Sequence, residues 1–151
     1  MIPRYSRKEI SAIWEENNKF NIWLKIERLA CEAQAKLGII PSNVAKRLSG
    51  AIKFDVERIN EIESTVKHDV IAFLTYIAEK VGVDVRYLHY GMTSSDVLDT
   101  CFAVQLKESC NILLENLKNL LAALKKKLRT IKVLCVLGAV TECMQSQQRL
   151  G

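Results

Sequence analysis

The sequence is poor in residues that interrupt helices and has no hydrophobic run of the length that crosses a membrane. Its 151 residues include six glycines and two prolines, and residues 1–130 show no strand-like alternation. This scarcity predicts an all-α fold. The N-terminus "MIPRYSRKE" has no apolar signal region, so we expect a cytoplasmic protein that does not bind a membrane.

The cysteines are odd in number and nowhere form a CxxC pair. Cys31, Cys101 and Cys110 fall among apolar helical positions, which predicts buried, reduced thiols. The two histidines lack the spacing of a metal motif, so we expect no bound metal. The sequence also contains no Gly-rich phosphate loop.

The net charge of +5 does not predict a nucleic-acid partner, because most basic residues alternate with acids, as in "KIERLACEAQAK". The one basic cluster, residues 125–129, lies where a helix is expected to end and suits the helix dipole there. Interleaved charge is typical of solvated helix faces.

Apolar periodicity and capping residues predict a series of helices before residue 93. The expected boundaries are a capping box at Ser6 and Glu9, a helix from about Asn18 to Gly38, a short helix capped by Ser42, a helix capped by Asp55, and a helix from Lys67 to Gly82.

A long helix is expected from Thr93, with a seam of apolar residues at steps of three and four. The seam residues are Val97, Cys101, Val104, Leu113, Leu117, Leu120 and Leu124. The short helices cannot cover this seam, so we expect the first rod of a bundle whose other rods lie elsewhere or in other subunits. The predicted organisation is an N-terminal helical domain (1–92), this long helix (93–132) and an aberrant, patternless tail (133–151).

Four polar stretches do not fit a core: Arg4-Tyr5, Lys67-His68-Asp69, His89-Tyr90 and residues 93–96, "TSSD". Each has a purely structural alternative: a loose arm, a helix cap, a hydrogen-bonding histidine or ordinary capping. Together they indicate an anion site, because a helix N-terminus with free amides and hydroxyls attracts negative charge and the basic side chains match it. The ligand class is one with carboxylates or phosphate.

The motifs "IPRYS", "TVKHDVIAFL" and "LHYGMTSSDVLDT" resemble those of adenylosuccinate lyases, in the fumarase/aspartase superfamily, across residues 1 to about 130. The resemblance implies all-helical protomers, a homotetramer with active sites built from several subunits, and no cofactor. It also implies a β-elimination that cleaves a C–N bond and releases fumarate. The substrates would be adenylosuccinate and the succinylated aminoimidazole carboxamide ribotide of purine synthesis.

By the same resemblance, the candidate residues divide into three groups. Arg4 and Tyr5 match a nucleotide-binding arm. The residues Lys67, His68 and Asp69 match a second binding stretch, in which His68 lies near the reacting centre. A third group, His89, Thr93 and Ser94, matches residues that bind the substrate's anionic groups. A hydroxyl-rich helix N-terminus suits charge that develops on a carboxylate during elimination.

Two parts of the family pattern are missing: the loop with the serine base and the "GR[ST]HG"-like stretch with the acid histidine. The tail reads "VLCVLGAVTECMQSQQRLG" where that stretch is expected. One permitted coding string for the tail, read from its third base, spells "TLCIGRSHGMHAEPTTFG", so we expect a frameshift a little before Val133. As written, the chain is expected to be a fragment that is inactive alone. The alternative is a non-catalytic helical interaction module derived from a lyase.

Overall fold

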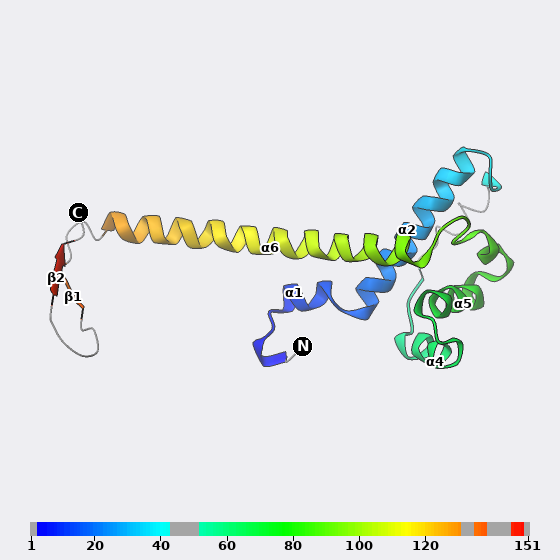
Figure 1. The fold of residues 1–151 in the computed structure, drawn as a ribbon, viewed down its shortest axis with the longest axis horizontal. Helices are drawn as coiled ribbons and strands as arrows, with labels where there is room; N and C mark the ends of the chain where they lie inside the picture. Colours follow the sequence, from blue (N-terminus) through cyan, green and yellow to red (C-terminus); the bar gives the residue numbers. More distant parts are fainter. Residues whose placement is uncertain (1–2, 43–51, 131–134, 139–145, 150–151) are drawn as a thin grey trace. The chain divides into compact units, whose positions relative to one another are not determined.

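The structure is a computed structural model that describes residues 3–42, 52–130, 135–138 and 146–149 (Figure 1). The chain divides by compactness into two units, residues 1–110 and 111–151, which are treated separately below.

Every described element in residues 3–130 is helical, which confirms the all-α prediction. In chain order these are η1 (Pro3–Tyr5), α1 (Lys8–Ile13), α2 (Glu16–Lys36), α4 (Val56–Val66), α5 (Asp69–Val81), η2 (Gly82–Tyr87) and α6 (Ser94–Thr130). No helix in the described ranges is long and apolar enough to span a membrane.

Most helix boundaries follow the expected chemistry. The Asp55 carboxylate accepts from the Arg58 backbone N–H at 3.1 Å, which confirms the predicted cap of α4. Gly82 ends α5 with φ of 74°, a left-handed conformation that glycine adopts without steric cost. The capping box at Ser6 was wrong: the N-cap of α1 is Arg7, and no side chain caps it. The short helix expected after Ser42 falls on residues outside the described ranges.

The core of the first unit is an aromatic cluster between α2, α5 and the segment before α4. The rings of Phe20 and Phe73 stack with centroids 5.8 Å apart, and Trp23 meets Phe73 edge-on at 5.3 Å. Phe54 adds a tilted contact with Phe73 at 5.9 Å. These side chains are all buried, and large rings in such geometry dominate the packing energy of a small core.

A buried tyrosine hydroxyl joins α5 to the chain that precedes α4. The Tyr76 hydroxyl accepts from the Asp55 backbone N–H at 3.0 Å and donates to the Lys53 carbonyl oxygen at 2.9 Å. Both polar capacities of a buried group are therefore satisfied, so the ring can be buried without an unpaired hydroxyl.

The beginning of α6 joins the core through Val97 and Cys101, which are buried, and the Cys101 thiol donates to the Lys19 carbonyl oxygen of α2 at 3.9 Å. Further along, the buried Gln105 amide donates to the Ile13 carbonyl oxygen at 2.8 Å, where α1 ends.

The apolar seam beyond these contacts is exposed. The exposed leucines on this part of α6 are Leu113, Leu114, Leu117, Leu120, Leu121, Leu124 and Leu128. Cys31 and Cys101 are buried free thiols as predicted, but Cys110 is exposed, so the predicted burial of that thiol was wrong.

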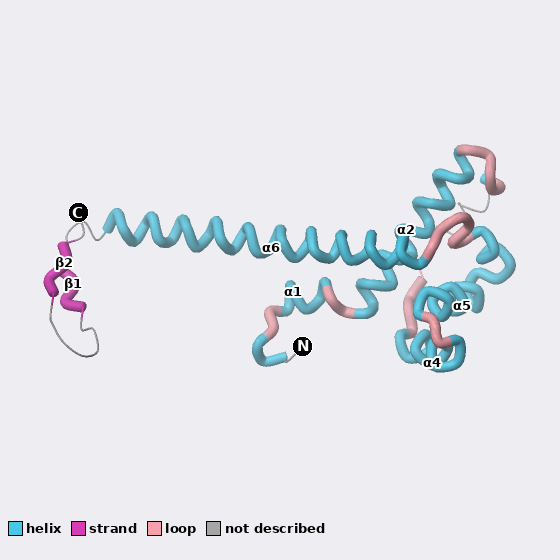
Figure 2. Tube along the Cα trace, viewed as in Figure 1, coloured by secondary structure: helices cyan, strands magenta, loops and turns pink. Residues whose placement is uncertain are grey.

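The tail contains a short antiparallel hairpin, drawn in magenta in Figure 2. Strand β1 (Cys135–Gly138) pairs with β2 (Ser146–Arg149), with Cys135 opposite Arg149. It is the one departure from helix in the described ranges, and it lies in the tail that has no helical periodicity.

Truncating Phe73 to alanine should lower the free energy of unfolding by about 3–5 kcal/mol, the range for removing a fully buried phenylalanine. Phe102→Ala is the matched control, because that ring is half exposed on α6, and we expect a loss of about 1 kcal/mol or less. Urea denaturation followed by circular dichroism measures both. Equal losses in the two variants would contradict the assignment of the core.

Candidate functional site

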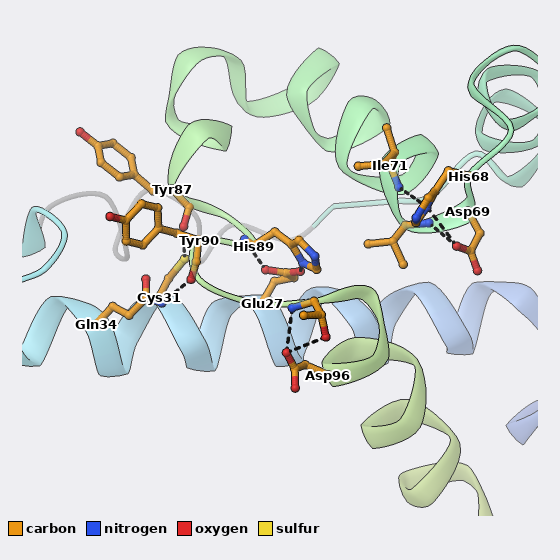
Figure 3. A network of polar contacts seen from close by, with 12 residues as sticks. Glu27, Cys31, Gln34, His68, Asp69, Ile71, Tyr87, His89, Tyr90 and Asp96 are labelled. Carbon is orange, nitrogen blue, oxygen red and sulfur yellow. Dashed lines mark hydrogen bonds and ion pairs between the residues drawn. The ribbon is translucent and has the colours of Figure 1, made fainter.

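The predicted site residues lie at three helix starts: η1, the turn between α4 and α5, and the segment that leads into α6. The structure joins His89, Thr93 and Asp96 into one neighbourhood, with Glu27 of α2 as an added member (Figure 3). No contact among the described residues joins these to His68 or to Arg4.

At the start of α6, Thr93 and Asp96 satisfy each other. Asp96 Oδ2 accepts from the Thr93 backbone N–H at 2.7 Å and from the Thr93 hydroxyl at 3.1 Å. The backbone N–H, followed by the hydroxyl, lowers the pKa of the Asp96 carboxyl. A lowered carboxyl pKa means that this contact is present at neutral pH and is lost as the pH falls through that lowered value.

This arrangement shows which hydroxyl takes part in capping. The Thr93 hydroxyl is engaged with Asp96, whereas the hydroxyls of Ser94 and Ser95 make no hydrogen bond with any described residue. The helix start is therefore closed by Thr93 and Asp96, and two further hydroxyls remain at the same end of α6.

His89 is held by a buried carboxylate. Its backbone N–H donates to Glu27 Oε2 at 2.6 Å, and its ring Nδ1 lies 2.7 Å from Glu27 Oε1. Glu27 is completely buried, and only 17% of the His89 side chain is exposed. A buried carboxylate is costly unless it is hydrogen-bonded, so these two contacts are what make the position tolerable.

Sequence reasoning missed Glu27, although a signal was present. Positions 20, 24, 27 and 31 follow steps of four and three on one face of α2, and Phe20, Leu24 and Cys31 are buried there. An acid at a core-facing position is unusual and calls for a buried partner. The interleaved charges of "KIERLACEAQAK", which include Glu27, instead indicate an ordinary solvated helix face.

The turn between α4 and α5 holds Lys67, His68 and Asp69. His68 is the N-cap of α5, and its Nδ1 accepts from the Ile71 backbone N–H at 3.4 Å. Asp69 Oδ1 accepts from the Val70 N–H at 2.7 Å. These contacts support the structural alternative, helix capping. His68 is the capping residue, and Asp69 adds a second hydrogen bond to the first turn.

Lys67 and His89 share an unusual backbone conformation. They are the only non-glycine residues with positive φ in the described ranges, at 56° and 58°. The left-handed region costs a residue with a side chain about 1–2 kcal/mol. Such costs persist where the surrounding contacts fix the chain and are concentrated at functional sites.

Arg4 and Tyr5 form a contact of their own in η1, with the guanidinium carbon 4.7 Å from the centre of the neighbouring ring. The described part of the chain contains no group of three or more side chains suited to hold a metal ion. What the site offers is a cationic and hydroxyl-bearing set of groups at helix starts.

Comparison with known proteins places the chain in a family. A family model described as Lyase matches residues 4–138. Adenylosuccinate lyase of Bacillus subtilis is 44% identical over 91% of this chain and 32% of its own length, and that of Synechocystis is 48% identical over 83% and 29%. The chain spans about a third of the length of these relatives.

A solved structure gives the same result at the level of the fold. A fumarate lyase from Mesorhizobium superposes with a TM-score of 0.68, at 23% identity, over 82% of this chain and 31% of that one. Because the family model matches residues 4–138, the chain belongs to the Lyase family.

Proposed function

We propose that these residues supply part of the substrate site of an adenylosuccinate lyase, which cleaves a C–N bond by β-elimination and releases fumarate. The observation that carries the proposal is the 40–48% identity to proteins named adenylosuccinate lyase over 83–91% of the chain. The substrate class is a succinylated purine nucleotide or its ribotide precursor, and no cofactor takes part.

The chemistry suits the start of α6. Removal of a proton beside a carboxylate builds negative charge on that carboxylate, and donors already aimed at this charge lower the barrier. Amides at the start of this 37-residue helix and the Ser94 hydroxyl supply such donors, and the Thr93 hydroxyl, which donates to Asp96 here, joins them only when it turns from Asp96 to the substrate. His89, on the adjacent segment, adds a further polar ring.

The remaining candidates take binding roles in this proposal. Arg4 and Tyr5 bind the nucleotide, Lys67 and Asp69 form a second binding stretch, and His68 lies near the reacting centre. Support comes from the exposed position of Lys67 and from the left-handed turn that presents it beside His68.

We also infer a division into an N-terminal helical domain (1–92), a bundle helix (93–132) and a frameshifted tail (133–151). The exposed leucines of α6 support a bundle completed by other subunits, as in a homotetramer. The buried free thiols Cys31 and Cys101 favour a reducing, cytoplasmic location.

A second candidate function is a non-catalytic helical module that pairs with a relative through the exposed leucines of α6. That role requires none of Arg4, His68, His89 and Ser94. It therefore predicts that substitutions at these residues leave binding to the relative unchanged, whereas substitutions of the leucines abolish it.

The role of the α6 start can be tested in a chimera that joins residues 1–132 to the remainder of the Bacillus subtilis enzyme. Thr93→Ala and Ser94→Ala should each lower kcat/KM by roughly ten- to a thousandfold, the range for losing a donor to developing charge. Ser95→Ala is the matched control and should leave turnover nearly unchanged. Thr93→Ser, which keeps the hydroxyl, should restore most of the loss. Normal turnover in both alanine variants would reduce the hydroxyls to capping groups.

The chain of 151 residues is expected to release no fumarate by itself and to self-associate through its exposed leucines. Leu117→Glu should shift it toward the monomer in sedimentation velocity, because a charge on the apolar face opposes its burial. Lys118→Glu, on the neighbouring exposed position, is the control and should have little effect. A wild-type chain that sediments as a monomer would exclude the proposed oligomer contact.

The origin of the tail can be read directly from nucleotides. Sequencing the gene across codons 125–151 should reveal codons for a glycine–arginine–serine–histidine stretch in the frame that begins at the third base of the tail's first codon. An insertion or deletion should lie shortly before Val133. If that frame encodes no such stretch, the frameshift proposal is wrong.

A further inference from the structure

One face of α2 holds the segment that carries His89. Glu27, Cys31 and Gln34 are spaced four and three residues apart, so they lie on the same side of the helix. All three make hydrogen bonds to residues 87–90, which run from the last residue of η2 into the segment before α6 (Figure 3).

Glu27 contacts His89 twice, at the backbone and at the ring. Its Oε2 accepts from the His89 N–H at 2.6 Å, and its Oε1 lies 2.7 Å from Nδ1. A carboxylate oxygen can only accept, so the proton in this 2.7 Å contact is on Nδ1. The ring is thus held with Nδ1–H toward Glu27.

Cys31 and Gln34 secure the backbone on either side of His89. The Cys31 thiol donates to the Tyr87 carbonyl oxygen at 3.3 Å, and the Gln34 amide donates to the Tyr90 carbonyl oxygen at 2.7 Å. Burial, with the nearby Glu27 charge, raises the pKa of the Cys31 thiol to about 11, so the sulfur keeps its proton and remains a donor.

These contacts explain how His89 keeps a left-handed conformation. With φ of 58°, the residue lies in a region that is unfavourable for a side chain. The carboxylate accepts the N–H that this conformation presents, and the two flanking carbonyls are fixed from the same helix. The segment is therefore constrained at three successive points.

The other ring nitrogen of His89, Nε2, makes no hydrogen bond with any described residue. His68 lacks such a single partner, because its Nδ1 lies 3.4 Å from both the Ile71 backbone nitrogen, which donates, and Asp69 Oδ1, which accepts.

We propose that Glu27 is a positioning residue that fixes the ring and tautomer of His89, with Cys31 and Gln34 as supports, so that Nε2 is the nitrogen that meets the substrate. This inference rests on the proposed function for its ligand, a succinylated purine nucleotide. The arrangement resembles the way in which a carboxylate orients a metal-bound histidine, where the second partner sets which nitrogen is presented.

The tautomers can be measured on the full chain, because His68 and His89 are its only histidines. Ring-nitrogen-labelled protein is examined by magic-angle-spinning NMR, which tolerates self-association, and His68→Asn assigns the two signals. We expect Nδ1 of His89 to carry the proton in the neutral ring. A His89 ring protonated only at Nε2 in the wild type would overturn the proposal without any further variant.

The variant Glu27→Gln tests whether Glu27 sets the tautomer of His89. The glutamine oxygen can still accept from the His89 N–H, but its amide then donates to Nδ1, so the His89 tautomer should invert to Nε2–H. Glu32→Gln, an exposed acid on the same helix, is the matched control and should leave both rings unchanged. An unchanged His89 tautomer in a folded Glu27→Gln protein would refute the role of Glu27.

The functional consequence is measured in the chimera described above. Glu27→Gln should lower kcat/KM by roughly ten- to a hundredfold, the range for losing a partner that orients an imidazole. Asparagine tolerates the left-handed conformation, so His89→Asn can serve as a background. In that background, Glu27→Gln should cause little further loss of kcat/KM. Fully additive losses would contradict the positioning role. A chimera with no lyase activity would refute the proposed function instead, while the NMR result would still decide the role of Glu27.

Discussion

The contact between Glu27 and His89 is the constraint on which the rest of the candidate site depends. A fully buried carboxylate must be hydrogen-bonded, and both of its oxygens here are used by one residue. Because His89 lies five residues before Ser94, where α6 begins, the contact holds the segment that leads into this helix. It connects α2, the centre of the aromatic core, to the place where the hydroxyls and free amides of α6 begin.

At the start of α6, Thr93 has a structural contact beside its proposed chemical role, whereas Ser94 has only the proposed one. Thr93 and Asp96 close the helix end through two hydrogen bonds, which leaves Ser94 and Ser95 without a structural task among the described residues. At the α4–α5 turn, by contrast, His68 has a capping contact of its own. A capping contact and a ligand contact use different ring nitrogens, so the first does not exclude the second.

The long helix carries a different constraint. Its first residues are covered by α1 and α2, but its leucines from 113 onward are exposed. A continuous apolar face of this kind is stable in water only when another surface covers it, and relatives of about three times the length contain more chain from which such cover can come. In the proposed function, the polar residues at the start of α6 serve ligand binding and the apolar face further along serves assembly.

The sequence by itself determined the helical class, the Asp55 cap, the glycine end of α5, the exposed seam and the set of candidate site residues. These depend on local periodicity, capping chemistry and short motifs, which are written in neighbouring residues. The capping box at Ser6 and the burial of Cys110 were wrong, because a helix end can shift by a residue and because burial on α6 depends on where the other helices stop. Only the tertiary structure decided the partner of His89, since Glu27 lies 62 positions away and no local pattern pairs the two. Long-range pairing of buried polar groups is set by how the helices pack, and for that reason the left-handed conformation of His89 and its ring orientation came from the fold alone.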